Sequence, residues 1–191
     1  MFKKMMLALG AVVLSSAVYA ADYPLTNWES TDKEGVISNL QANNFLYTIT
    51  ADYKNSGSNR TPEIGWIRAK NTPNGRIGVD MVKYNQFEFD VKVDSELAGT
   101  MFQLYFGVTC ATGKKGEVCI SQKFEPGKSY QVIIPAKVFT RLDDASLKNV
   151  QSLQFVVYEK HMPDATELKL QFNNLRLTSG SDGMIKIKVN E

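Results

Sequence analysis

Apolar and polar residues alternate with a period of two along most of this chain, and that spacing is typical of half-buried β-strands. Residues 86–94 show it most clearly, because every second side chain is apolar and the side chains between them are charged or polar. Residues 101–108 repeat the pattern, with apolar side chains at the even-numbered positions. The same spacing predicts further strands over residues 45–50, 64–69, 118–124, 129–135, 150–158 and 168–177, and a lysine-bearing edge strand over residues 184–189.

Turn-forming residues separate these runs, as in residues 55–59, 71–75 and 125–127. Helix is limited to single turns over residues 138–142 or 145–150. The sequence therefore predicts an all-β fold, a two-sheet antiparallel β-sandwich of about eight or nine strands with little helix and a jelly-roll topology.

The first twenty residues have the parts of a signal peptide. Lys3 and Lys4 precede an apolar run over residues 5–17, and residues 17–20 carry the small-x-small pattern that signal peptidase cleaves. The apolar run is short for a membrane-spanning helix, so no stable membrane insertion is expected. We expect residues 1–20 to be a signal peptide cleaved near Ala20. Residues 21–191 then form a single β-sandwich domain that is periplasmic or secreted.

The charges of the expected mature chain balance. Of the 22 basic residues, Lys3 and Lys4 lie in the signal peptide, so 20 remain against 20 acidic residues. Nucleic-acid binding requires a basic excess that neutralises phosphates, and nucleic acid is therefore not an expected partner.

Two cysteines, Cys110 and Cys119, flank a short loop that contains two glycines. In an oxidising compartment, an even pair at this spacing predicts a disulfide bond that closes a hairpin. Chain-entropy arguments give such a bond about 2–3 kcal/mol of stability. A redox or metal-binding pair is disfavoured, because CxxC spacing is absent and His161 is the only histidine of the chain.

Residues 129–177 carry a recognisable order of motifs. A strand ends in Ile134-Pro135, a loop with Phe139 follows, and the next strand includes residues 147–155. The last strand ends in residues 173–177, Asn-Asn-Leu-Arg-Leu. This block resembles the galactose-binding-like jelly roll shared by carbohydrate-binding modules of secreted polysaccharide-degrading enzymes. The resemblance implies a sandwich with Phe155, Phe172 and Leu175 inside, and a non-catalytic, secreted, glycan-binding protein.

The resemblance also bears on metal binding. In that family an Asp at the position of Asn173 often lies near a structural calcium ion, together with an acidic residue close to the mature N-terminus. Here an amide replaces the carboxylate, and Glu29 is the matching N-terminal acid. Calcium accepts amide oxygens as ligands, so the resemblance implies a weakened calcium site at Glu29 and Asn173. No other cofactor is expected.

Sugar binding requires a flat aromatic ring that stacks on a pyranose face, with polar groups nearby for the hydroxyls. The alternation places suitable side chains on the polar faces of several strands. These candidate ligand-binding residues are Trp66, Arg68, Gln103, Tyr105, Gln131, Gln154 and Tyr158. If their strands belong to one sheet, they form a continuous strip. The competing interpretation is that outer strand faces simply carry polar residues and some tyrosine.

Two other functions stay open at this point. An envelope or host-facing protein could use the sandwich loops to bind a protein partner. A small glycoside-active enzyme could use Glu88 and Asp90, because alternate carboxylates on one strand face supply the acid and nucleophile of jelly-roll glucanases. Lys92 interrupts that face, and related sugar-binding modules carry similar strands without catalysis.

Overall fold

The computed structural model describes residues 22–25, 28, 36–41, 44–50, 63–66, 78–94, 98–158, 167–181 and 183–190. The predicted signal peptide lies outside these residues, as do Glu29, Arg68 and His161. Within the described part of the chain, no helix combines the length and the hydrophobicity that crossing a membrane requires.

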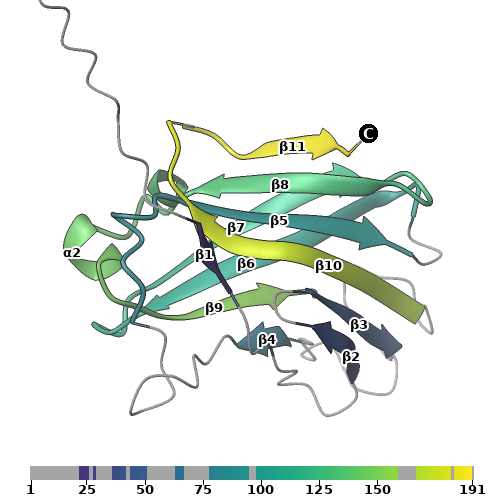
Figure 1. Ribbon diagram of the computed structural model, residues 1–191, viewed down its shortest axis with the longest axis horizontal. Coiled ribbons are helices and arrows are strands. Elements are labelled where there is room, and N and C mark those ends of the chain that lie inside the picture. The colour runs from purple at the N-terminus through teal and green to yellow at the C-terminus, as the bar shows by residue number, and fades with distance from the viewer. Residues whose placement is uncertain are drawn as a thin grey trace, which may run out of the picture.

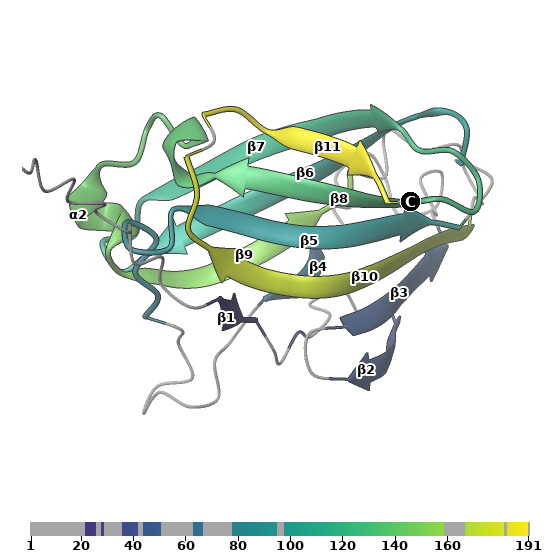
Figure 2. The ribbon, with the colours of Figure 1, turned by 45° about the horizontal axis from the view of Figure 1, so that its top comes forward.

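The strands form two antiparallel sheets that pack face to face (Figures 1 and 2). The large sheet has the strand order β11 (Lys186–Val189), β8 (Ser129–Pro135), β5 (Gln86–Val93), β10 (Glu167–Thr178), β3 (Asn44–Thr50) and β2 (Val36–Gln41), with β1 (Tyr23–Pro24) paired to β10. The small sheet has the order β4 (Glu63–Trp66), β9 (Val150–Val156), β6 (Met101–Cys110) and β7 (Lys115–Lys123). The predicted fold class is confirmed.

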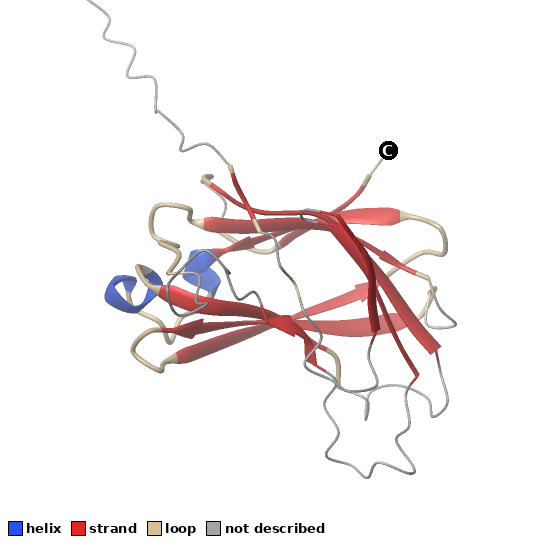
Figure 3. Cartoon of the chain, turned by 60° about the horizontal axis from the view of Figure 1, so that its bottom comes forward, coloured by secondary structure: helices blue, strands red, loops and turns tan. Residues whose placement is uncertain are grey.

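Nine of these strands fall on runs that the alternation predicts, including the edge strand β11, which pairs with β8. Strands β1 and β2 were not predicted, because residues 23–24 and 36–41 carry no clear two-residue alternation. The helical turns are η1 (Ala136–Val138) and α2 (Asp144–Leu147). Figure 3 shows the two sheets as separate layers, with both helical turns at one end of the sandwich.

Aromatic rings fill the space between the sheets. Phe87 of the large sheet stacks on Phe106 of the small sheet with 4.2 Å between ring centroids. Phe155 of the small sheet stacks on Phe172 of the large sheet at 4.4 Å. Trp28 covers this cluster, because its ring stacks on Phe155 at 5.3 Å and its indole N–H donates to the carbonyl of Leu25 at 3.1 Å. The predicted interior positions Phe155, Phe172 and Leu175 are fully buried.

Replacing Phe155 tests this core. Its ring contacts the rings of Trp28, Phe87, Phe89, Phe106 and Phe172. Phe155→Ala should lower the free energy of unfolding in urea by about 3–5 kcal/mol, because a cavity replaces these contacts. Met101→Ala is the matched control, since Met101 lies on the small sheet and is 65% exposed. Equal effects of the two substitutions would contradict this description of the core.

Candidate functional site

Four of the predicted binding residues converge on the outer face of the small sheet. The inner face takes the even-numbered residues of β6 together with Leu153, Phe155 and Val157, and these are buried side chains. Gln103 and Tyr105 on β6 therefore point outward, and so do Gln154 on β9 and Tyr158 just after it. Together with Glu117 of β7, these residues form what we call the tyrosine face.

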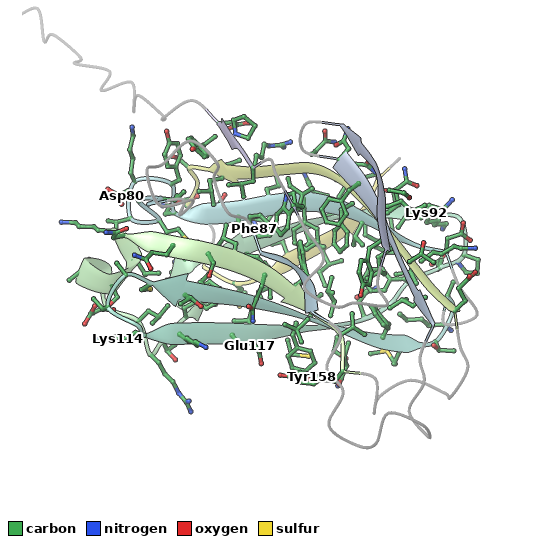
Figure 4. All side chains as sticks on the ribbon, turned by 90° about the horizontal axis from the view of Figure 1, so that it is seen from below. Asp80, Phe87, Lys92, Lys114, Glu117 and Tyr158 are labelled. Atoms are coloured by element: carbon green, nitrogen blue, oxygen red, sulfur yellow. The ribbon has the colours of Figure 1, made fainter. Side chains whose placement is uncertain are left out.

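Contacts among these side chains fix their orientation. The rings of Tyr105 and Tyr158 meet edge to face, with 4.6 Å between centroids and 85° between planes. The Tyr105 hydroxyl donates to Oε1 of Gln103 at 3.2 Å, and the Tyr158 hydroxyl donates to Oε1 of Glu117 at 3.4 Å. Figure 4 shows Tyr158 and Glu117 on the outside of the small sheet and Phe87 between the layers. The two tyrosines are thus held before any ligand arrives.

The surroundings of Tyr105 raise the pKa of its phenol above the ordinary value. Burial and the Cys119 thiol beside it are the main causes that raise the pKa of Tyr105 to about 12, and Tyr158 and Glu117 add to the effect. Cys119 lies directly opposite Tyr105 in the pairing of β6 with β7. The phenol of Tyr105 therefore remains a hydrogen-bond donor throughout the physiological pH range.

Gln154 lies across a glycine on the neighbouring strand. It pairs with Gly107 in the register of β6 and β9. A Cβ atom at position 107 would lie 3.1 Å from Cγ of Gln154, so the glycine leaves room for this side chain. The Oε1 atom of Gln154 is covered and accepts no hydrogen bond within the described structure. Such an acceptor is costly unless water or a ligand donor satisfies it.

A pocket of about 490 Å³ continues the tyrosine face toward the β6–β7 hairpin. We call it the end pocket, and it shares Glu117 and Gln154 with the tyrosine face. Its volume lies within the range of small-molecule sites. Its lining is Gly107, Val108, Thr109, Lys115, Gly116, Glu117, Val138, Phe139, Thr140, Arg141 and Gln154.

One wall of the end pocket comes from the loop between β8 and β9. Phe139 and Leu142 anchor this loop, because both side chains are buried and pack over Gly116 of β7. A Cβ atom at Gly116 would come within 2.9 Å of each of them. Asp143 then caps α2 through the backbone N–H of Ser146 at 2.8 Å and accepts from Nζ of Lys114 at 2.7 Å. These contacts hold the pKa of Asp143 well below its usual range.

Three charged residues of the end pocket, Lys115, Glu117 and Arg141, are not among the binding residues that the sequence predicts. The predicted strand began at residue 118, because the residues before it were assigned to a loop closed by the predicted disulfide. Strand β7 begins at Lys115 instead, and its alternation places Lys115 and Glu117 on the outer face. Extending the two-residue period backward from residue 118 would have identified Lys115 and Glu117 as outward-facing. Arg141 lies in a loop, where no period indicates a direction.

The predicted disulfide bond between Cys110 and Cys119 is wrong. The chain turns immediately after Cys110, whose N–H donates to the carbonyl of Lys114 at 2.9 Å. Cys119 therefore pairs with Tyr105, five residues along β6 from Cys110. That separation is about 16 Å at the rise of a β-strand, well beyond the span of a disulfide. Cys110 is also buried and Cys119 exposed, so the two side chains lie on opposite faces of the sheet.

Not all of the predicted binding residues join the tyrosine face. Trp66 is in register with Gln154 at the far side of β9, but its side chain lies outside the described residues, as does Arg68. Gln131 belongs to β8 and therefore lies on the outer face of the large sheet, where its amide donates to Oε1 of Glu88 at 2.6 Å. The expectation that Gln131 shares one strip with the others is wrong.

The two candidate catalytic carboxylates have structural partners on the large sheet. Glu88 is only 8% exposed and forms an ion pair with Arg176 in addition to its hydrogen bond from Gln131. Asp90 accepts from the side-chain amides of Asn174 at 2.6 Å and Asn190 at 3.1 Å. Both carboxylates are thus engaged in holding β5 to its neighbours.

The predicted calcium ligands are described only in part. Asn173 is half-buried and pairs with Asp90 next to a β-bulge, where Asn174 takes a positive φ of 55°. Glu29 lies outside the described residues, and within those residues no group of three His, Cys, Asp or Glu side chains gathers. The calcium site stays a prediction.

Solved structures similar to this chain include carbohydrate-binding modules. The family 11 module of a cellulosomal cellulase from Clostridium thermocellum has a TM-score of 0.52 and 13% identity, and the match covers 85% of this chain and 96% of the module. A family 30 carbohydrate-binding module has a TM-score of 0.50 and 13% identity, with coverage of 85% and 86%. The predicted resemblance to carbohydrate-binding modules is confirmed at the level of the jelly-roll fold.

An agarase is also similar, with a TM-score of 0.52 and 13% identity. The match covers 84% of this chain but only 25% of the agarase, so this chain spans about a quarter of that enzyme. No protein-family model matches the sequence, and no curated protein sequence is significantly similar to it.

The unpaired cysteines give a direct chemical prediction. A thiol reagent should label Cys119 quickly in the folded protein and Cys110 only slowly, because Cys110 is buried and burial raises the pKa of its thiol. Mass spectrometry after labelling checks this, with Cys119→Ser as the control that removes the fast reaction. A disulfide-bonded native chain with no reactive thiol would contradict the structure.

The ion pair of Arg176 with Glu88 gives a second prediction. Arg176→Ala should lower the free energy of unfolding by about 1–3 kcal/mol, because it leaves a nearly buried carboxylate without its charged partner. Lys169→Ala on the same strand is the matched control. The ion pair of Lys169 with Glu167 is exposed, so its loss should change the stability little. Equal stability changes in urea unfolding would refute a structural role for Glu88.

Proposed function

We propose that this protein is a non-catalytic carbohydrate-binding β-sandwich that holds a glycan along the tyrosine face. The observation that carries the proposal is the preformed pair of Tyr105 and Tyr158, flanked by three polar side chains on one outer sheet face. The fold that the chain shares with carbohydrate-binding modules supports the same function.

The chemistry of the tyrosine face suits a sugar. A pyranose ring presents C–H groups on its faces and hydroxyls around its rim. Aromatic rings with a polar tip match the faces, and amide or carboxylate groups match the hydroxyls. Tyr105 and Tyr158 supply the rings, whereas Gln103, Glu117 and Gln154 supply the polar groups. Because contacts among these side chains already fix their positions, binding costs little ordering entropy.

The sequence supports one further feature of the proposal, export, and the structure supports another, binding without catalysis. The basic and apolar start of the chain supports export to the periplasm or to the outside, where polysaccharides are found. The engagement of Glu88 and Asp90 with Arg176, Gln131, Asn174 and Asn190 supports binding without catalysis. The proposed partner is therefore a polysaccharide or another glycan. If no glycan binds, a protein partner is the alternative.

A glycan array followed by calorimetry on the best ligand tests this proposal. Tyr105→Ala and Tyr158→Ala should each weaken binding by roughly tenfold or more, because each removes a stacking surface and a hydroxyl donor. Tyr105→Phe should retain most of the affinity, since the ring remains.

Gln131→Ala is the matched control for these variants. It removes a polar side chain from the outer face of the other sheet and should leave glycan affinity unchanged. The proposal would be contradicted if the native protein binds no glycan. It would also be contradicted if the tyrosine variants bind as well as the native protein. Co-purification of a protein partner in that case would favour an interaction domain instead.

A further inference from the structure

Two cations, Lys115 and Arg141, line the end pocket from different elements of the fold. Lys115 begins β7 and points outward opposite Thr109, whereas Arg141 comes from the loop between β8 and β9. Within the described residues, neither side chain has a carboxylate within ion-pair distance. Some surface lysines are paired, as Lys114 is with Asp143 at 2.7 Å and Lys128 with Glu125 at 2.6 Å, but Lys115 is not among them. Two cations without counter-ions thus gather at one pocket.

The backbone that carries Arg141 is firmly held. Arg141 lies between the buried residues Phe139 and Leu142, and the N–H of Leu142 donates to the carbonyl of Phe139 at 2.8 Å. On the other side, Asp143 ties the loop to the β6–β7 hairpin through Lys114. Since Lys115 belongs to the same hairpin, the two cations keep a fixed relation at the level of the backbone.

One carboxylate, that of Glu117, also lines the end pocket, and it makes one side of the pocket acidic. Glu117 is two residues along β7 from Lys115 and accepts from the Tyr158 hydroxyl, so it lies on the side of the tyrosine face. Lys115 lies on the hairpin side of Glu117. A ligand that extends from the tyrosine face along β7 therefore passes a hydrogen-bond acceptor before it reaches Lys115.

We propose that the end pocket binds an anionic group, a carboxylate or a sulfate, on the glycan that the tyrosine face holds. This inference rests on the proposed function and adds the class of ligand, an acidic saccharide. Lys and Arg donors form charge-assisted hydrogen bonds with such groups, and these are stronger than bonds to neutral hydroxyls. A neutral glycan would leave both cations without a charged partner.

Matched ligand pairs test the inference by calorimetry. Oligogalacturonides compared with their methyl esters differ in the carboxylate charge and one methyl group per ester, and dextran sulfate oligosaccharides compared with dextran differ in the sulfate groups. We expect the charged member of at least one pair to bind roughly tenfold tighter than the neutral member, and the pair that responds identifies the anion.

The double variant Lys115→Gln/Arg141→Gln should abolish this preference. Lys123→Gln is the matched control, because Lys123 lies on the same strand and on the same exposed face but does not line the end pocket. It removes one positive charge and should leave the preference intact.

The outcomes separate this inference from the proposed function. Equal binding of charged and neutral members, with both weakened by Tyr105→Ala, would overturn the inference and leave the proposed function standing. A charge preference that survives in the double variant would place the anion site elsewhere and also overturn it. Native protein that binds none of these ligands and no glycan on an array would overturn both.

Discussion

The packing of Phe155 and Phe106 between the two sheets determines what the small sheet presents to its surroundings. Side chains of a strand alternate strictly, so burying these two rings turns Tyr105 and Gln154 outward on neighbouring strands. A shift of one residue in the pairing of β6 with β9 would place polar groups in the core. The apolar core and the tyrosine face are therefore two consequences of one register, and the stability of the first preserves the geometry of the second.

Features that depend on the local sequence could be predicted, and features that depend on contacts between distant segments could not. The direction of Gln103, Tyr105, Gln154 and Tyr158 depends only on alternation within a strand, and the sequence predicts it correctly. The sheet to which a strand belongs depends on long-range pairing, which is why Gln131 was placed with the wrong group. The hairpin after Cys110 was predicted, but its loop was predicted too long, because the cysteine spacing indicated a bond that the strand register does not allow.

The site has a second part that no strand pattern reveals. The end pocket depends on Gly116, whose missing side chain lets Phe139 and Leu142 approach β7, and on Asp143, which fixes the following loop. Arg141 and Lys115 line the same pocket, although the two residues are far apart in the sequence. An aromatic and polar surface thus continues into a pocket that two cations line, and the two parts offer different chemistry to one extended ligand.

The central claim is that the outer face of the small sheet holds a glycan, and a crystal structure with the best oligosaccharide from an array tests it most directly. The account predicts a sugar ring in contact with Tyr105 and Tyr158, with hydroxyls bonded to Gln103, Glu117 or Gln154. A sugar bound on the large sheet beside Gln131 and Glu88, or at the sandwich loops away from the small sheet, would contradict it.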